Sequence, residues 1–420
     1  MKLLYRLGAT AYQAAIGLAS LWSAKAKARH RGSRKALAEL PATTEGQACF
    51  WMHCASVGEF EQGRPVWAEL QEMHPEARFV LSFYSPSGYE QFCRKADVGE
   101  VVYLPPDTDS TARTWVARLS PTLALIVKYE WWLGYHDALS AAAVPTVLLS
   151  AAFRQNQPFF RWYGSAWRKA LKELAAVFVQ DTASAELVRS LGQNKVFAAG
   201  DTRLDRTLAV RQKSLNHDAL QAFAKGHSFL LVAGSTWPAD DRLIAAALTE
   251  FDNQTSRIGL CVAPHEVDAS AVDRTIDAFS AFKPVRLSSI DPGSGMLDGE
   301  VSRVLVIDEI GLLSRLYRLG HAAYVGGGFG AGVHNTLEPA VYGIPIAVGP
   351  RNAKFVEVAA LRSRGILSEV KSSAQLVDFL RQSARPEVQS EVLAKAETYI
   401  ADNAGATQRI LTTLAHLKLV

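Results

Sequence analysis

Short apolar segments alternate with helix-like stretches along most of the chain, and this alternation restricts the possible folds most strongly. In the first half, the pattern predicts strands at residues 49–55, 79–84, 101–104, 123–129, 146–150, 177–179 and 196–199. It starts again in the second half, with strands predicted at residues 229–233, 258–263, 285–287, 304–307, 322–325 and 345–348. Strands separated by helices are typical of a parallel, doubly wound sheet. The sequence therefore predicts an α/β protein with two such sheets.

The two halves predict two domains with a polar connection between them. We expect a first domain at residues 36–207, a connection at 208–228, and a second domain at 229–420 that ends in helices. Ligands of doubly wound sheets bind at the carboxyl ends of the strands. Two facing sheets would therefore form a cleft, and we expect the active site there.

Composition permits a large enzyme and gives no reason to expect a nucleic acid as a partner. The chain has 420 residues, 49% of them hydrophobic, and a net charge of only +4. Its four cysteines form no CxxC pair and no zinc-binding spacing, which fits a reducing compartment. We expect no metal and no cofactor.

The amino-terminal 35 residues differ from the rest of the chain. Residues 7–24 carry no charge, and six basic residues follow: Lys25, Lys27, Arg29, Arg31, Arg34 and Lys35. The apolar stretch is just long enough to span a bilayer but is only weakly hydrophobic. The basic residues would favour anionic lipid and stay on the cytoplasmic side. We expect membrane attachment, with spanning and interfacial binding both open; the alternative is an amphipathic helix packed on the body.

A glycine-rich loop in residues 324–350 predicts a site for a nucleotide-sugar. An apolar strand ends in a loop that includes Gly327 and Gly328, and a short helix then carries Asn335, Thr336, Leu337 and Glu338. Glycines let a backbone approach a ligand, and free amides at a helix start attract an anion. The acid one turn along can hold a sugar hydroxyl. The alternative is a tight strand-to-helix turn of any α/β protein.

Two turns in the first half follow the same plan of strand, small residues and helix. In the first, Ser56 and Gly58 precede Glu59, a candidate base at the helix start. The helix dipole should keep the pKa of Glu59 low, and the alternative role is a helix cap. The second turn contains Ser85, Ser87 and Gly88, whose amides could hold an anion; the alternative is a helix cap followed by proline.

Charged residues also end two strands of the first half. Lys128, Tyr129 and Glu130 follow a fully apolar run, where charged residues are rare unless they face a site. Arg203 follows the last strand of this half, where it could bind a phosphate or carboxylate.

In the second half, two further turns after strands are candidates for nucleotide contact. Ser235 and Thr236 suit a phosphate, and Pro264 and His265 could border a nucleobase or ribose. The alternative for each is a turn with a capped helix.

Two strings imitate known binding motifs. Asp107-Thr108-Asp109 is a DxD string, which binds a metal in some glycosyltransferases, but here it is more consistent with capping the helix that begins near Ser110. Residues 326–331 fit GxGxxA, but they come late in the chain and no acid ends the next strand. A dehydrogenase is therefore disfavoured.

Taken together, the motifs resemble those of the 3-deoxy-D-manno-octulosonic acid (Kdo) transferases of lipopolysaccharide synthesis. They run in the family's order across residues 50–350: HCASVGE, SFYSPSGYE, LALIVKYEWW, SAAFR, FVQDTASAELVRSLG, GDTRLDR, AGSTWP, APHE, LSRLY, VGGGFGAGVHNTLEP and GIPIAVGP. The resemblance implies a GT-B glycosyltransferase fold of two Rossmann-like domains. It also implies an inverting, metal-independent transfer from CMP-Kdo to a lipid A precursor, lipid IV-A, at the cytoplasmic face of the inner membrane.

The resemblance also implies roles for particular residues. Glu59 matches the family's catalytic base, and Glu130 and Arg203 match positions that stabilise the transition state. The CMP-binding segments would include Pro264, His265, Ile310, Gly311, Leu312 and residues 335–338. The family commonly has an acid where this chain has Leu312; a backbone contact to the nucleotide would survive that change, whereas a side-chain contact would not.

Two other functions stay open from the sequence. One is a GT-B transferase that uses a different nucleotide-sugar, and the other is a catalytically inactive, membrane-bound binding module. The presence of Glu59, Glu130 and Arg203 counts against the inactive module.

Overall fold

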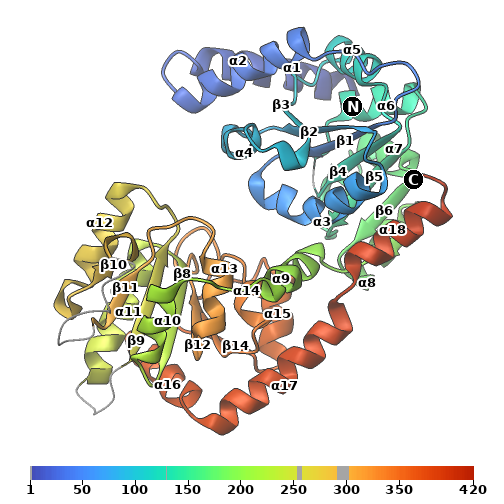
Figure 1. Ribbon diagram of the computed structural model, residues 1–420. Helices are drawn as coiled ribbons and strands as arrows, with labels where there is room; N and C mark the ends of the chain where they lie inside the picture. Colours follow the sequence, from blue (N-terminus) through green and yellow to red (C-terminus); the bar gives the residue numbers. More distant parts are fainter. Residues whose placement is uncertain (1, 129, 253–257, 291–301) are drawn as a thin grey trace. The chain divides into compact units, whose positions relative to one another are not determined.

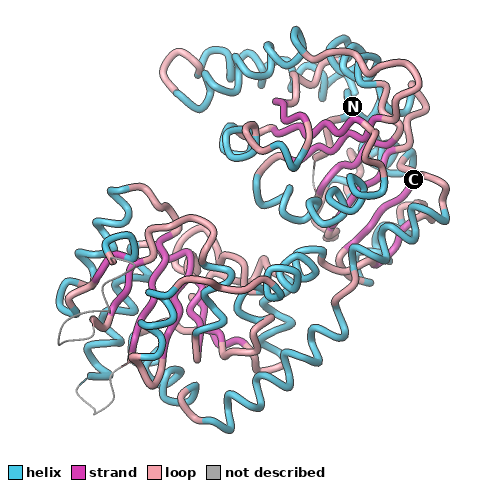
Figure 2. The backbone as a smooth tube through the Cα atoms, in the orientation of Figure 1, coloured by secondary structure: helices cyan, strands magenta, loops and turns pink. Residues whose placement is uncertain are grey.

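The computed structural model describes residues 2–128, 130–252, 258–290 and 302–420 (Figure 1). The chain forms two compact units, one of residues 1–205 with 404–420 and one of residues 206–403. Strands and helices alternate along the chain in both units (Figure 2).

The first unit is built on a seven-stranded parallel sheet in the order β3-β2-β1-β4-β5-β6-β7. Its strands are β1 (Cys49–Cys54), β2 (Arg78–Phe83), β3 (Glu100–Tyr103), β4 (Leu123–Val127), β5 (Thr146–Ala151), β6 (Ala176–Val179) and β7 (Val196–Ala198). The helices between and before them are α1 (Lys2–Ala19), α2 (Ala24–Glu39), α3 (Val57–Met73), α4 (Pro86–Phe92), α5 (Asp109–Leu119), α6 (Leu133–Ala141), α7 (Ser165–Glu173) and α8 (Thr182–Ser190). The predicted parallel sheet of this half is confirmed.

Both faces of this sheet are buried, which explains why its strands read as continuous apolar runs. All six residues of β1 are buried. Phe50 and Met52 pack into a core on one face with Trp67 of α3, whereas Trp51 packs into the opposite core with Trp115 of α5. Successive side chains thus alternate between the two faces, as expected for a strand.

The last helix, α18 (Ala406–His416), belongs to the first unit. Ile410, Leu411 and Leu414 enter the core that contains Phe50. Asp205 fixes the start of the helix by accepting hydrogen bonds from the amides of Gly405 (2.7 Å) and Thr407 (2.6 Å). The sequence grouped this helix with the second half because its apolar periodicity does not show which sheet it covers.

The second unit has its own seven-stranded parallel sheet, in the order β10-β11-β9-β8-β12-β13-β14. Its strands are β8 (Leu230–Thr236), β9 (Gly259–Pro264), β10 (Val285–Arg286), β11 (Val304–Val306), β12 (Ala322–Val325), β13 (Ile346–Val348) and β14 (Leu367–Glu369). Its helices are α9 (Thr202–Gln212), which begins in the first unit, α10 (Asp218–Lys225), α11 (Pro238–Asp252), α12 (Ala269–Ala278), α13 (Leu313–Leu316), α14 (Leu337–Ala340), α15 (Val356–Ser363), α16 (Ser373–Ser383) and α17 (Pro386–Asn403).

The polar stretch expected to connect the domains folds as part of the second unit. Residues 208–228 contain the end of α9 and all of α10, in which Leu220 and Phe223 are fully buried. The charged composition of this stretch did not predict a helix packed on a domain, because only two residues of α10, Leu220 and Phe223, are buried.

Helix α1 lies against the first unit through its inner face and leaves apolar side chains on its outer face. Leu4, Leu7 and Leu18 are exposed by 60–65%, and Leu21 and Trp22 after the helix by more than 70%. Within the described part of the chain, the length and hydropathy needed to cross a membrane are not met by any helix.

Candidate active site

A hydrogen-bonded group holds Glu130 at the carboxyl end of β4. The Glu130 Oε2 atom accepts a hydrogen bond from Trp132 Nε1 (2.6 Å) and lies 3.2 Å from His53 Nε2. The other ring nitrogen of His53 lies 2.9 Å from the Ser82 hydroxyl. Because His53 is almost fully buried at the end of β1, its ring cannot turn freely. Glu130 is thus held in one orientation by two rings.

Glu59 lies in the first turn of α3, as predicted, but its environment differs from the expectation. The pKa of Glu59 is raised to about 7 by burial and, to a smaller extent, by the nearby Glu130, which together outweigh the lowering effects of the Ala55 amide and Lys128. The Ala55 amide donates to Glu59 Oε2 at 2.5 Å. The expected low pKa was wrong because desolvation and a neighbouring carboxylate outweigh the helix dipole. A carboxylate with a pKa near neutrality suits a general base.

Lys128 lies between the acidic groups of this site. Its ammonium lowers the pKa of both Glu59 and Asp201, so it interacts with residues that follow two different strands. Its backbone has a φ of 58°, in the left-handed region that is costly for a side-chain-bearing residue. Such strain at the end of a buried strand is typical of functional sites. Tyr129, predicted beside it, lies outside the described residues.

Arg203 is held by Asp201 at the start of α9. Its Nη2 atom lies 2.5 Å from Asp201 Oδ2, and its Nε donates to the same carboxylate at 3.0 Å. Burial raises the pKa of Asp201, but Arg203 and Lys128 outweigh it, so the net pKa is lowered. The Thr202 hydroxyl donates to the Gln62 carbonyl of α3, which ties this turn to the helix of Glu59. Glu59, Glu130, Lys128 and Arg203 therefore share one end of the first sheet.

The second small-residue turn of the first unit behaves as a helix cap. The Ser85 hydroxyl accepts from the Gly88 amide (3.2 Å), and Pro86 takes the first position of α4. A Cβ atom on Gly88 would lie 2.4 Å from the Phe83 ring, so packing explains this glycine. The Ser87 hydroxyl lies 3.3 Å from that of Ser85. The structure thus favours the capping alternative over an anion site.

Ser56 and Gly58 are the small residues of the turn before Glu59, and a backbone hydrogen bond from Ser56 helps to lower the pKa of Glu59. Ser56 precedes α3 without a side-chain capping bond, and a Cβ on Gly58 would meet nothing within 4 Å. Both lie next to Glu59 and leave space beside it.

The two aspartates of the DxD string bind residues of neighbouring helices. Asp107 accepts hydrogen bonds from the Tyr5 hydroxyl (2.6 Å) and from the amides of Gly134 (3.3 Å) and Tyr135 (3.0 Å). Asp109 pairs with Arg6 at 2.6 Å. The cap of α5 is Thr108, whose hydroxyl accepts from the Thr111 amide, rather than either aspartate. In the described ranges, no group of three His, Cys, Asp or Glu residues could hold a metal.

In the second unit, the glycine loop packs tightly against its neighbours. The Gly327 amide donates to Asp240 (2.9 Å), so it is not available to a phosphate. A Cβ on Gly328 would lie 2.6 Å from the backbone of Gly349. The glycines therefore let the loop approach neighbouring backbone, which differs from the expectation that they approach a ligand.

Asp240 organises this loop, and the sequence analysis gave it no role. It is fully buried in the first turn of α11. It accepts hydrogen bonds from the Tyr324 hydroxyl (2.7 Å) and the Trp237 amide (3.0 Å) as well as from Gly327. Its position three residues after Trp237 predicts no more than an acid in the first turn of an ordinary capped helix, so the sequence did not indicate its contacts with the glycine loop.

The helix after the glycine loop is a single turn. The Leu337 amide donates to Asn335 Oδ1, and Asn335 Nδ2 donates to Glu338, both at 3.2 Å. Helix α14 has four residues, too few to build a useful dipole, and its first amide is already capped. Thr336 and Leu337 are fully buried. The expected anion site at this helix start is therefore not supported.

Asn335 and Glu338 remain candidates for binding a hydroxyl. Burial raises the pKa of Glu338, although Asn335 and Arg206 of α9 lower it. A buried carboxyl that already has amide and guanidinium neighbours can still accept a hydrogen bond from a sugar.

Three flat rings stack at the carboxyl ends of β8 and β9. The His265 ring lies 4.9 Å from Trp237 and 4.1 Å from His334, both nearly parallel to it. Trp237 Nε1 donates to His334 Nε2 at 3.1 Å. Burial and, to a smaller extent, the neighbouring His265 lower the pKa of His334 to about 4, so the ring is neutral at pH 7. The sequence singled out Pro264 and His265, but not Trp237 or His334.

The remaining predicted donor residues lie in two turns of the second unit. Ser235 has a φ of 52° and Thr236 is buried, and a Cβ on Gly326 would lie 2.3 Å from the Ser235 carbonyl oxygen. Before α13, Ile310 is exposed by 88%, Gly311 has a φ of 89°, and the Leu312 side chain is buried. The backbone of residues 310–312 is therefore what this turn can offer a nucleotide.

Comparison with known proteins finds similarity to one family of transferases. The model of the 3-deoxy-D-manno-octulosonic-acid transferases (kdotransferases) matches residues 27–206. The chain is 26% identical over 351 residues to a 3-deoxy-D-manno-octulosonic acid transferase of Aquifex aeolicus, covering 82% of this chain and 89% of that one. It is 27% identical over 384 residues to the Bordetella pertussis enzyme of the same name, covering 87% and 86%.

The chain is thus similar to the Kdo transferases over most of its length. Solved structures with low sequence identity show the fold. UDP-GlcNAc 2-epimerase from Neisseria meningitidis matches with a TM-score of 0.61 at 14% identity, covering 88% of this chain and all of that one. Acinetobacter baumannii MurG matches with a TM-score of 0.55 at 11% identity, covering 88% and 99%. The predicted GT-B glycosyltransferase fold is confirmed.

Proposed function

We propose that this Kdo transferase is an inverting enzyme that moves Kdo from CMP-Kdo to lipid IV-A, a lipid A precursor, in lipopolysaccharide synthesis. The observation that carries the proposal is Glu59, a carboxyl whose pKa is raised to about 7 within a cluster of charged residues. Similarity to the Kdo transferases supports the sugar and the reaction class.

In the proposed reaction, Glu59 takes the proton of the acceptor hydroxyl as that oxygen attacks the anomeric carbon of Kdo. The new carbon–oxygen bond forms on the face opposite the departing CMP, whose phosphate oxygen keeps the electron pair of the broken bond. The configuration is therefore inverted. Negative charge is present on the Kdo carboxylate and accumulates on the leaving phosphate, and Lys128 and Arg203 supply nearby positive charge.

The second unit is proposed to bind the CMP part of the donor. The stacked rings of Trp237, His265 and His334 offer a platform for a planar base, and Trp237 is 38% exposed. Asn335 and Glu338 are proposed to hold a hydroxyl of the ribose or sugar. The backbone of residues 310–312 would supply further contacts.

The amino-terminal helices are proposed to bind the inner membrane on its cytoplasmic face, where a glycolipid acceptor would be found. The apolar outer face of α1 continues through Leu21 and Trp22. Exposed cations follow on α2: Lys25, Lys27, Arg31, Arg34 and Lys35. An apolar face beside a basic one is typical of helices that lie in the membrane interface on anionic lipid.

The test is transfer from freshly generated CMP-Kdo to a tetraacyl lipid A precursor in detergent, measured by mass spectrometry. We expect a product heavier by one or more Kdo units, and we expect Glu59→Gln to bind the donor but to form no product. The proposed base would be refuted if Glu59→Gln kept full activity. CMP should raise the melting temperature and UDP should not; the reverse would indicate a transferase with another donor.

A further inference from the structure

Tyr5 of helix α1 contacts the segment that follows Glu130. The Tyr5 hydroxyl accepts a hydrogen bond from the Leu133 amide (3.1 Å) and donates one to Asp107 (2.6 Å). Asp107 in turn accepts from the next two amides, Gly134 and Tyr135. The first three amides of α6 are therefore held by Tyr5 and Asp107 together. Helix α6 begins directly after Trp132, whose indole holds the Glu130 carboxylate.

Tyr12, two turns further along α1, connects to the same carboxylate by a second route. Its hydroxyl accepts a hydrogen bond from the Tyr84 hydroxyl (2.8 Å). The Tyr84 ring stacks on Trp132, with centroids 5.0 Å apart and planes at 21°. Trp132 Nε1 then donates to Glu130 at 2.6 Å. Three contacts thus join α1 to the Glu130 carboxylate.

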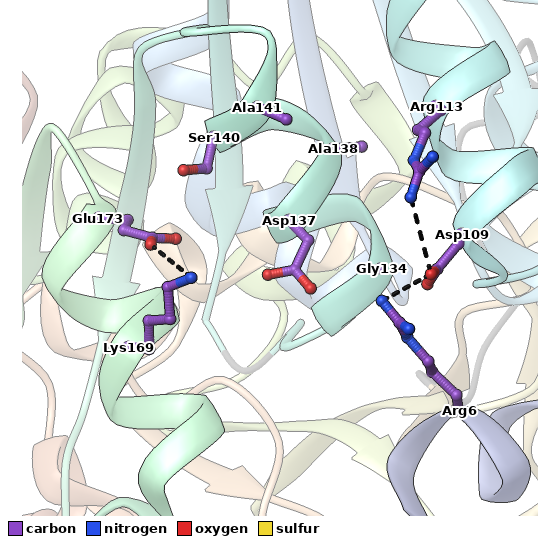
Figure 3. A pocket seen from close by; sticks show the side chains of 10 residues that line it. All are labelled: Arg6, Asp109, Arg113, Gly134, Asp137, Ala138, Ser140, Ala141, Lys169 and Glu173. Carbon is purple, nitrogen blue, oxygen red and sulfur yellow. Dashed lines mark ion pairs between the residues drawn. The ribbon is translucent and has the colours of Figure 1, made fainter. Parts of the chain in front are cut away.

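Further contacts hold both routes in place. The Arg6 guanidinium pairs with Asp109 at 2.6 Å, next to the pocket shown in Figure 3. The buried guanidinium of Arg29 on α2 lies 4.2 Å from the centre of the Tyr84 ring. Helix α1 is therefore pinned near its start and in its middle, and Tyr84 is restrained from α2 as well.

We propose that Tyr5 and Tyr12 are positioning residues for Glu130, so that α1 is a working part of the active site and not only an anchor. This inference rests on the proposed function, in which Glu59 is the base, and on the effect of the neighbouring Glu130 charge on Glu59. Without the two hydroxyl groups, the segment from Glu130 to Tyr135 loses the hydrogen bonds that connect it to α1, directly at Leu133 and through Tyr84. The Glu130 carboxylate then spends more time away from Glu59.

Movement of Glu130 away from Glu59 should change the pH dependence of transfer, which a general loss of stability would not do. Part of the raised pKa of Glu59 comes from the charge of Glu130. When that charge moves away, the pKa of Glu59 falls, and its basic form persists to lower pH. The acid limb of the pH profile for transfer should then move to lower pH while the maximal rate decreases.

The experiment compares Tyr5→Phe, Tyr12→Phe and the double variant with wild type in the full-length protein. Tyr163→Phe is the matched control, because it removes a hydroxyl from the same unit without touching either route. We expect kcat to fall about tenfold in the double variant, with the donor KM within about twofold of wild type. The acid limb should move down by about half a pH unit. The control should match wild type in all three values.

Hydrogen–deuterium exchange of the peptide covering residues 130–136 provides a readout that does not need activity. Tyr5→Phe should speed exchange there, because the Leu133 amide loses its acceptor. Unchanged exchange together with an unchanged pH profile in the double variant would overturn the inference. If wild type forms no Kdo product, the proposed function fails, whereas the exchange result still decides whether α1 holds the segment.

Discussion

Replacing Glu59 with glutamine should stabilise the protein while removing transfer. The pKa of this carboxyl is about 7 in the folded protein against an ordinary value of 4.5. The folded state therefore binds the proton more tightly than the unfolded state. The contribution to stability is present at low pH and is lost as the pH rises from 4.5 through 7.

The size of this effect follows from the two pKa values. At pH 8, the difference corresponds to about 3 kcal/mol of lost stability, whereas at pH 5 it is less than about 1 kcal/mol. Glutamine has the same shape, stays neutral and can still accept the Ala55 amide. We therefore expect Glu59→Gln to be stabilised at pH 8 by up to about 3 kcal/mol and to be nearly neutral at pH 5.

The assay is urea unfolding at pH 5 and pH 8, followed by tryptophan fluorescence. This signal reports mainly on the first unit, because Trp237 lies in the second unit and the other eight of the nine tryptophans lie in the first. Glu69→Gln, an exposed carboxyl on the same helix, is the control and should change little at either pH. An equal effect of Glu59→Gln at both pH values would refute the argument that burial raises this pKa.

Three further predictions concern both units. Glu130→Gln should move the acid limb of residual transfer to lower pH, because removing its charge lowers the pKa of Glu59; an unmoved limb in the pH–rate profile would count against their coupling. Asp240→Asn should weaken the thermal protection given by CMP, because an amide cannot accept all three hydrogen bonds that Asp240 now accepts. If a thermal shift assay showed undiminished protection, the glycine loop would have no part in CMP binding. Gly328→Ala should destabilise the second unit by about 1–3 kcal/mol in urea unfolding, whereas Gly58→Ala, whose Cβ has open space, should change stability by less than about 0.5 kcal/mol; equal effects would contradict the packing argument.

The sequence predicts the sheets well because each buried strand is a local signal. Residues 49–55 were expected as a strand, and β1 spans Cys49–Cys54. Strands β10 and β14, with two and three residues, carry little such signal, and β14 was missed. The placement of α18 was also missed, because the partners of its apolar face lie more than 200 residues away in the chain.

In the candidate site, the sequence predicted where the residues lie better than it predicted their pKa values and hydrogen-bond partners. Glu59 was expected at a helix start, but the sign of its pKa shift depends on Glu130, which follows a different strand. Gly327 was expected to present its amide, but Asp240, far away in the sequence, accepts that hydrogen bond. Local patterns cannot show which distant group occupies a donor or surrounds a carboxyl.

The return of the chain to the first unit sets the order in which the two units can be completed. Residues 206–403 are contiguous, so the second unit has its whole core once Asn403 has been synthesised. The first unit, although it begins the chain, lacks Ile410, Leu411 and Leu414 until after the second unit has been synthesised. Part of the apolar core of the amino-terminal half therefore stays uncovered throughout the synthesis of residues 206–403.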